Sequence, residues 1–258
     1  MLSLMADSTP QRTAAMLVIG NEILTGKVQE ANVAVVAELF FELGIALRRI
    51  IVCVDDVDVI AEDVRRLSED HDVVVTCGGI GPTHDDVTYD GVAKAFQRAI
   101  VREPELEALL RGYHESKGWE ITEAQLRMAN IVEGAELLRG EKHPWPTMKV
   151  ENVFVLPGVP EIFRFKMPIL RKTLARGERF FSQKVYTRCR EGDIADLLEK
   201  LEAKFDAVQV GSYVAWDHAK YTTLITFDGA NEQATLDAAQ VFIDAIGADF
   251  VGRSLEEL

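Results

Sequence analysis

The 258-residue sequence is poor in cysteine, in proline and in positive charge. Its three cysteines, Cys53, Cys77 and Cys189, are too few and too far apart for a disulfide framework, and we expect no structural zinc, iron–sulfur cluster or haem. With only 8 prolines and 48% hydrophobic residues, the chain is neither disordered nor of low complexity. The composition is therefore typical of an ordinary globular protein.

Basic residues are scarce because 28 Lys and Arg residues stand against 42 Asp and Glu residues, a formal net charge of −14. Such a surface repels phosphate backbones and anionic lipids, so we expect neither nucleic acid nor a membrane as a partner. No apolar run approaches the roughly 18 to 20 residues that span a bilayer. The beginning of the sequence lacks the basic start and apolar core of a signal peptide. These absences predict a cytoplasmic protein.

Apolar runs alternate with helical spacing of apolar residues over residues 14–100. The runs predict strands over 14–20, 48–54 and 72–77, and the spacing predicts helices over 32–43, 58–68 and 89–100. Strands that alternate with helices in this way form a parallel sheet with right-handed crossovers. The first part of the chain is therefore predicted to be an α/β domain.

The rest of the sequence predicts helices over 104–117 and 122–132, an irregular stretch over 134–149, a strand over 152–156, and a helix over 161–175 that Pro168 interrupts. Beyond Gly177 the order changes to strand (183–188), helix (193–205), two strands (207–213 and 221–227) and helix (231–246). That order is typical of a small α+β domain. We therefore predict a flexible tail over 1–13, an α/β domain over 14–177 and a small α+β domain over 178–258.

The loop GGIGPTHDDVT, from Gly78 to Thr88, follows the third predicted strand. Ligands of open parallel sheets bind at the carboxyl ends of the strands, where this loop lies. Glycines let a ligand approach the backbone, and their N–H groups together with the next helix N-terminus favour an anion such as phosphate. The predicted phosphate-binding residues are Gly78, Gly79, Gly81, Thr83 and Thr88. In the alternative interpretation, Thr83 and Asp86, or Asp85, only cap the helix.

Two carboxylates beside a phosphate repel it unless a cation lies between them. Asp85 and Asp86 therefore predict a hydrated divalent metal ion with oxygen ligands, magnesium or cobalt. The first strand ends at Asn21 and Glu22 and the second at Asp55, so acidic and amide groups are delivered to the same edge of the sheet. The candidate catalytic residues are Asp55, Asp85 and Asp86; the candidate metal ligands are Asp85, Asp86 and Glu22; and Asn21 is a further ligand contact. Each of these residues alone is better explained as a cap or a solvated turn, for example Asp55 before the helix that starts at Asp58. Their convergence at one edge favours the metal–phosphate site.

Three further features leave alternatives open. The loop PGVPE, over 157–161, is either a rigid turn or a wall of the ligand site that would include Gly158. The basic stretch over 162–190, which contains Lys166, is interpreted mainly as a solvated helix face. Three aromatic residues of the second domain are expected to pack internally rather than to stack on a ligand: Tyr213, Trp216 and Tyr221.

The loop GGIGPTHDDVT and the following YDGVAKAF resemble the molybdopterin-binding-like domain of the competence/damage-inducible protein A family and the N-terminal domain of eukaryotic FAD synthases. The segments IGNEILTG and LPGVP, with Asn32 and Asp55, fall at the other signature positions of that family. The resemblance covers residues 14–175, and the sequence around Gly211-Ser-Tyr213 is similar to the small α+β domain that follows in the same family.

This resemblance implies a three-layer α/β/α fold with a mostly parallel sheet, of the molybdenum cofactor biosynthesis type. It implies a metal-dependent pyrophosphatase that acts on ADP-ribose in one branch and on FAD in the other. The implied binding positions are Gly78, Gly79, Gly81, Thr83, Asp85, Asp86 and Thr88, with Asn21, Glu22 and Asp55 beside them. Residues 139–149 depart from the usual segment of the competence proteins, which favours the FAD-synthase-like branch.

Two functions remain open at this point. The first is a hydrolase of a nucleotide pyrophosphate, which the paired acids favour. The second is a non-catalytic protein that binds molybdopterin or a nucleotide, which the lack of an obvious general base favours; metal dependence of turnover distinguishes the two. Either way, the expected partner is a small-molecule nucleotide or pterin phosphate, and a closed homo-oligomer is expected because symmetric assembly is common.

Overall fold

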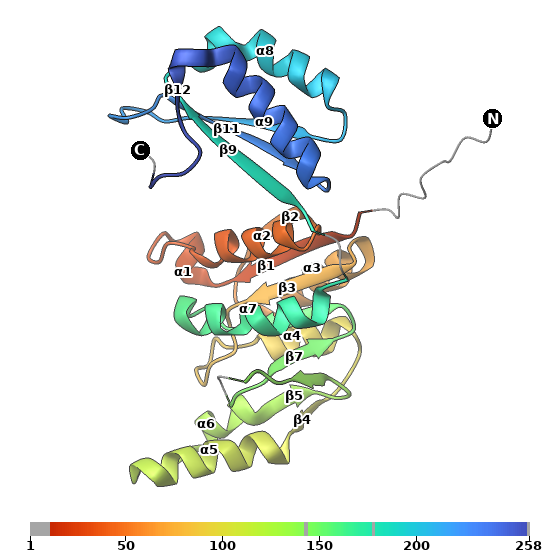
Figure 1. Cartoon of the computed structure of the whole chain (residues 1–258). Helices are drawn as coiled ribbons and strands as arrows, with labels where there is room; N and C mark the ends of the chain where they lie inside the picture. Colours follow the sequence, from red (N-terminus) through yellow and green to blue (C-terminus); the bar gives the residue numbers. More distant parts are fainter. Residues whose placement is uncertain (1–10, 142–143, 177–178, 257–258) are drawn as a thin grey trace, which may run out of the picture. The chain divides into compact units, whose positions relative to one another are not determined.

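The computed structural model describes residues 11–141, 144–176 and 179–256 (Figure 1). The chain forms two compact units. Of the described residues, the first contains 11–41 and those from Ile45 to Ala175, and the second contains Glu42–Gly44 and those from Arg176 onward. Each unit has its own hydrophobic core. Among the described residues, no helix is both long and apolar enough to cross a membrane.

A six-stranded sheet in the order β2-β1-β3-β8-β7-β6 is the centre of the first unit. The strands β2 (Ala46–Cys53), β1 (Thr13–Ile19), β3 (Val73–Cys77) and β8 (Val153–Leu156) are parallel. The strands β7 (Thr147–Val150) and β6 (Glu136–Leu138) are antiparallel additions at one edge. Residues 14–19 of β1 are all buried because helices cover both faces of a central parallel strand.

Helices lie on both faces of this sheet. Helices α3 (Val57–Asp70) and α4 (Thr88–Ala95) share a core with the face of β1 that carries Ala15, Leu17 and Ile19. Helices α2 (Asn32–Glu42) and α7 (Pro160–Leu174) lie on the other face (Figure 1). A short helix, α1 (Asn21–Leu24), follows β1 directly. The predicted three-layer α/β/α fold with a mostly parallel sheet is confirmed.

Three predictions about the middle of the chain are wrong. The helix predicted over 89–100 ends at Ala95, and β4 (Ile100–Arg102) follows it. The helix predicted over 122–132 is one turn, α6 (Glu123–Leu126), then a 3-10 turn (Arg127–Ala129) and β5 (Asn130–Val132), which pairs with β4. The stretch over 134–149 contains β6 and β7. For β4 and β5 the cause is pairing between segments 28 to 32 positions apart, whose Ile and Val residues favour strands once they have a partner. β6 and β7 pair with each other over a shorter separation.

Two further helices of the first unit differ in how well they were predicted. Helix α5 (Pro104–Lys117) has the predicted bounds, with proline in its first turn and Gly118 as a left-handed C-cap. Helix α7 passes through Pro168 without a break, so the predicted interruption is wrong.

The second unit is an antiparallel sheet with two helices. Its strands, in the order β10-β11-β9-β12, are β10 (Gln209–Val214), β11 (Thr223–Gly229), β9 (Phe181–Thr187) and β12 (Phe250–Gly252). Helices α8 (Glu191–Lys204) and α9 (Glu232–Ile246) share a core with this sheet, and a 3-10 turn (Gly247–Asp249) precedes β12. The unit is a small α+β fold, as predicted.

The expected packing of three aromatic residues in this unit is wrong for two of them. Tyr213 and Trp216 are 56% and 93% exposed, because they lie at the end of β10 and in the loop that follows it. Tyr221 does pack, with its ring edge-on to that of Tyr186 at 4.8 Å between centroids.

Candidate functional site

The carboxyl ends of β1, β2, β3 and β8 lie at one edge of the main sheet because these strands are parallel neighbours. Hydrogen bonds donated by backbone N–H groups join the loops there. The N–H of Asn21 donates to the carboxylate of Asp55 at 2.7 Å, and the N–H of Gly78 donates to the carbonyl oxygen of Leu156 at 3.1 Å. The structure thus brings the predicted residues Asn21 and Asp55 together, and it joins the glycine loop to the end of β8.

The path of the glycine loop requires glycine at its first two positions. Gly78 and Gly79 have φ angles of +104° and +63°, which other residues rarely adopt. A Cβ atom on Gly78 would lie 2.2 Å from the carbonyl oxygen of Ile19, and one on Gly79 would lie 2.4 Å from Oγ1 of Thr88. The loop therefore passes against the end of β1 with no space for a side chain.

Two residues predicted to contact the ligand instead support this loop in the structure. Thr88 is fully buried, and its hydroxyl donates to the carbonyl oxygen of Gly78 at 2.8 Å. Gly158 packs on Gly78, since an added Cβ would lie 3.3 Å from the Cα of Gly78, and its carbonyl oxygen accepts from Nδ2 of Asn32 at 2.8 Å. Their hydrogen-bonding groups hold the loop in place.

Asn32 joins three elements at this edge and was not assigned a role from the sequence beyond its place in the resemblance. It is 3% exposed at the start of α2, and its Nδ2 also donates to Sγ of Cys77 at 3.1 Å. Burial raises the pKa of the Cys77 thiol to about 12, so this sulfur stays protonated and is no nucleophile. In the sequence, the position of this amide residue at the start of an apolar helical stripe is the feature that could have predicted a supporting role.

The side chain of Thr83 contacts the carboxylates of both consecutive aspartates of the loop. Its Oγ1 is 2.6 Å from Oδ1 of Asp85 and 2.5 Å from Oδ2 of Asp86, and its N–H donates to the same Asp86 oxygen at 2.8 Å. The hydrogen bond from Thr83 lowers the pKa of Asp85. A hydroxyl carries one hydrogen and a carboxylate only accepts, so the two carboxylates share a single hydroxyl donor. This arrangement concentrates negative charge at the loop.

The helix-capping interpretation of these residues is wrong. Helix α4 begins at Thr88, and its N-cap residue, Val87, makes no side-chain cap. Asp85 and Asp86 bond to Thr83 within the loop instead. The cap expected from Asp55 is also absent, because α3 is capped by the neighbouring Asp56, whose carboxylate accepts from two N–H groups of the first turn at 2.8 and 3.1 Å.

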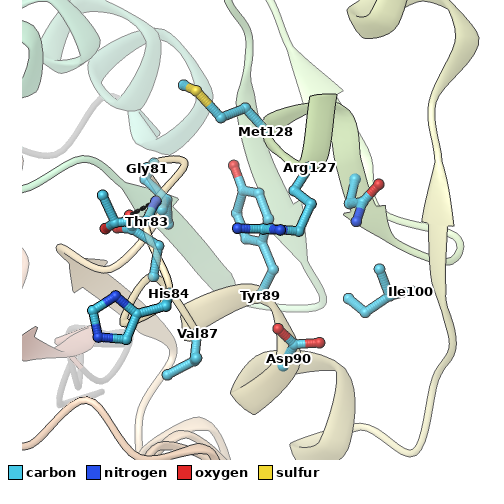
Figure 2. Close-up of a pocket in the computed structure, with 12 residues that line it drawn as sticks. Gly81, Thr83, His84, Val87, Tyr89, Asp90, Ile100, Arg127 and Met128 are labelled. Atoms are coloured by element: carbon cyan, nitrogen blue, oxygen red, sulfur yellow. Dashed lines mark hydrogen bonds between the residues drawn. The ribbon is translucent and has the colours of Figure 1, made fainter. Parts of the chain in front are cut away.

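A cavity of about 340 Å³ opens beside this loop (Figure 2). One wall comes from the glycine loop and the start of α4, and the other from β4, the 3-10 turn and the start of β5. Arg127 links the walls, since its Nη2 donates to the carbonyl oxygen of Pro82 at 3.1 Å. The lining residues are Ile80, Gly81, Thr83, His84, Asp86, Val87, Tyr89, Asp90, Ile100, Arg127, Met128 and Asn130.

The second wall of this cavity does not follow from the sequence. Arg127, Met128 and Asn130 fall in the segment that was predicted as one helix, which would have placed them on different faces. Only the end of that helix and the pairing of β5 with β4 bring them beside the glycine loop. The loop wall, in contrast, contains the predicted residues Gly81, Thr83 and Asp86.

The predicted metal ligands do not form a complete site by themselves. Among the residues that the structure describes, no three His, Cys, Asp or Glu side chains are grouped so that they could hold a metal ion. The carboxylate of Glu22 folds back on its own loop, since a Cβ on Gly20 would lie 2.5 Å from its Oε1. Asp85 and Asp86 remain as an adjacent pair, and a pair is what Mg²⁺ commonly takes from a protein when substrate phosphates and water complete its shell.

Known proteins match both units. Residues 15–175 match the probable molybdopterin binding domain family, and residues 179–254 match the middle domain of FAD synthase. A protein of Archaeoglobus fulgidus is 32% identical over 224 residues, which are 87% of this chain and 93% of that protein. A probable FAD synthase of Caenorhabditis elegans is 31% identical over 89% of this chain, and this chain spans about half of it, 49%.

A solved structure is also similar to this chain. The protein CinA, of unknown function, from Thermoplasma acidophilum is 29% identical, with a TM-score of 0.57 over 64% of this chain and 99% of that chain. That share is about the size of the first unit, which contains the glycine loop and the cavity.

Proposed function

This chain belongs to the probable molybdopterin binding domain family and carries a FAD synthase middle domain after it, and we propose that it is a metal-dependent hydrolase of a nucleotide diphosphate, of the ADP-ribose or FAD class. The observation that carries the proposal is the pair Asp85 and Asp86 around one hydroxyl, beside a glycine loop that opens on a cavity. The FAD synthase relatives support a dinucleotide as substrate.

The backbone of the glycine loop provides donors for the diphosphate. In the described part of the chain, the N–H groups of Gly79, Ile80 and Gly81 donate to no acceptor. Helix α4 adds the positive end of its dipole, with no side chain capping it. Backbone donors held in a rigid loop suit the oxygen atoms of a phosphate, and they need no rearrangement when it binds.

The carboxylates of Asp85 and Asp86 explain why a cation is part of the proposal. Both would repel a diphosphate bound to the loop, and the hydroxyl and N–H of Thr83 that donate to them carry no net charge to offset their two negative charges. A bound divalent ion neutralises the diphosphate and lowers the pKa of a coordinated water. Asp85 and Asp86 would hold that ion, and Thr83 would fix the orientation of both carboxylates.

The proposed reaction adds one water across the diphosphate bridge. An oxygen–phosphorus bond forms to the attacking water, the bridging phosphorus–oxygen bond breaks, and two phosphomonoesters leave. ADP-ribose would give AMP and ribose 5-phosphate, and FAD would give AMP and FMN. AMP is the common product and therefore the quantity to measure.

The test is release of AMP from ADP-ribose and from FAD, with Mg²⁺, Co²⁺ or EDTA. We expect turnover that requires the metal and that falls by about 100-fold or more in Asp85→Asn/Asp86→Asn, because the variant loses both ligand charges. The matched control is Asp70→Asn, an exposed acid at the end of α3.

Two results would contradict the proposal. Equal turnover in EDTA would remove the metal from the reaction. Absence of turnover with every metal, together with retained binding of a nucleotide or pterin phosphate, would leave the non-catalytic binding protein as the better interpretation.

A further inference from the structure

The cavity beside Thr83 has a polar wall that the proposed reaction does not use. Its volume, about 340 Å³, is at the lower end of ligand sites, which range from about 300 to 1,000 Å³. A space of this size takes one part of a dinucleotide and not the whole. The polar groups of this wall indicate which part of the dinucleotide it would bind.

Asp90 offers an acceptor to the cavity. It lies in the first turn of α4 and lines the cavity, where Figure 2 shows its carboxylate at the top of the helix. No hydrogen bond or ion pair to Asp90 is found within the described residues; the nearby Lys94 is paired with Asp58 instead. Asp90 is exposed to solvent, so its carboxylate is open to hydroxyl or N–H donors of a ligand.

Asn130 and Tyr89 offer donors. The side-chain oxygen of Asn130 accepts from Nε of Arg102 at 2.7 Å, which leaves its NH₂ group to donate. The ring of Tyr89 packs against the main core and the residue also lines the cavity, so its hydroxyl is a candidate donor to a ligand. Burial raises the pKa of Tyr89, so this hydroxyl stays protonated and donates.

Arg127 provides the positive charge. Among the described residues that line the cavity it is the one Lys or Arg, and within that part of the chain its guanidinium makes a single hydrogen bond, to the carbonyl oxygen of Pro82. Its position next to the glycine loop suits a phosphate at the mouth of the cavity, because guanidinium pairs strongly with phosphate oxygens. Figure 2 shows Arg127 and Asp90 reaching the cavity from its two different walls.

We propose that this cavity receives the polyhydroxylated part of the substrate that follows the diphosphate, a ribose or a ribityl chain, with Asp90 accepting from its hydroxyls and Arg127 pairing with the adjacent phosphate. The inference rests on the proposed function for the position of the diphosphate on the glycine loop. Alternating acceptor and donor groups match a polyol, whose hydroxyls both donate and accept.

The test is direct binding, by calorimetry in Mg²⁺, of three probes: ribose 5-phosphate, n-pentyl phosphate and inorganic phosphate. The first two have similar length, and only the first carries hydroxyls. We expect the protein to bind ribose 5-phosphate about 10-fold more tightly than pentyl phosphate, the effect of one charge-assisted hydrogen bond. Asp90→Asn should reduce that preference to within about twofold and leave the affinity for inorganic phosphate unchanged.

The second variant tests the phosphate contact. Arg127→Met should weaken all three probes by about 10-fold, whereas Arg190→Met, an exposed arginine of the second unit paired with Asp193, should weaken none. The control for Asp90→Asn is Asp70→Asn. Thermal unfolding of each variant shows whether it is folded.

Equal affinity of the unaltered protein for ribose 5-phosphate and pentyl phosphate would overturn the inference, and this outcome depends on no variant. An unchanged preference in folded Asp90→Asn would also overturn it. These results are separate from the AMP assay, since binding needs no turnover. If the protein releases no AMP but still prefers ribose 5-phosphate to pentyl phosphate, the hydrolase proposal fails and the polyol site stands. If it releases AMP but shows no such preference, only the polyol site fails.

Discussion

Lys166 is a charged side chain inside the first unit. It is 2% exposed on α7, and its Nζ donates to the carbonyl oxygens of Trp145 and Pro146. Burial lowers its pKa from 10.5 to about 8. The sequence placed this residue on a solvated helix face, so that interpretation is wrong for Lys166. The Lys166 ammonium group and the carbonyl oxygens of Trp145 and Pro146 therefore form a buried polar contact.

The lowered pKa predicts a stability that rises with pH. Below about pH 8 the lysine is charged in both states, and the folded protein bears the cost of burying that charge. Between about 8 and 10.5 the folded state releases the proton while the unfolded state keeps it, so the free energy of unfolding gains up to about 1.4 kcal/mol per pH unit. Lys166→Met should lack this gain, as measured by urea unfolding at several pH values.

Other groups titrate in the same pH range. The effect of Lys166 is therefore the difference between the protein and each variant in the slope of the free energy of unfolding against pH. Lys172→Met, an exposed lysine near the end of the same helix, should keep the slope of the unaltered protein. A slope in Lys166→Met equal to that of the unaltered protein would show that Lys166 does not titrate in this window.

At the residue scale, the sequence predicted the types of group at the site better than their partners. Glycines and acids at a strand end already indicate a phosphate and a cation. That Thr88 holds Gly78, or that Asn32 holds Gly158, depends on contacts between segments up to 126 residues apart. Such contacts leave no trace in local spacing, and the burial of Lys166 was missed for the same reason.

Helix α7 contains a proline in its interior and still runs unbroken from Pro160 to Leu174. Pro168 has no N–H, so the carbonyl oxygen of Arg164 lacks its partner one turn later in the helix. Pro168→Ala should raise the free energy of unfolding by about 2 kcal/mol, which is the roughly 3 kcal/mol cost of an interior proline less the up to about 1 kcal/mol that proline contributes by restricting the unfolded chain. Chemical denaturation measures this change.

Pro160→Ala is the matched control. Proline is tolerated at the first position of a helix, where Pro160 lies, so its replacement should leave the stability unchanged or slightly lower. If Pro168→Ala proved no more stable than the unaltered protein, the packing around α7 would have to depend on the proline ring itself.

At the element scale, buried strands were the most predictable part of the fold. β1, β3 and β8 are apolar on both faces because helices cover both sides of the sheet, and short apolar runs are the mark of such strands. Among the failures are β4 and β5, three-residue strands whose paired residues are 28 to 32 positions apart in the sequence. Without that partner, the apolar spacing over 122–132 fits a helix as well as a strand.

The whole molecule consists of two units with separate cores, and this predicts separable stability. Phe227 is fully buried in the second unit, with its ring 5.7 Å from that of Phe242. Phe227→Ala should destabilise this unit by about 3 to 5 kcal/mol and leave the phosphate affinity of the first unit unchanged. Hydrogen exchange followed by mass spectrometry would report each unit by its own peptides.

Leu255→Ala, which truncates a side chain that is 64% exposed, is the control and should alter neither unit. Equally faster exchange in both units of Phe227→Ala would show that they unfold as one. The homo-oligomer expected from the sequence stays a prediction, which sedimentation of the purified protein would test.

The close passage of Gly78 over the carbonyl oxygen of Ile19 has a consequence for how ligand choice evolves. The backbone that would hold the phosphate is fixed by the main sheet and tolerates no added atom. The facing wall belongs to a separate two-stranded sheet, β4 and β5, and to the turn before β5. We therefore expect relatives to keep the glycine loop and its way of binding an anion. We expect them to differ within residues 100–130, where the facing wall contacts the part of the ligand that is attached to the anion.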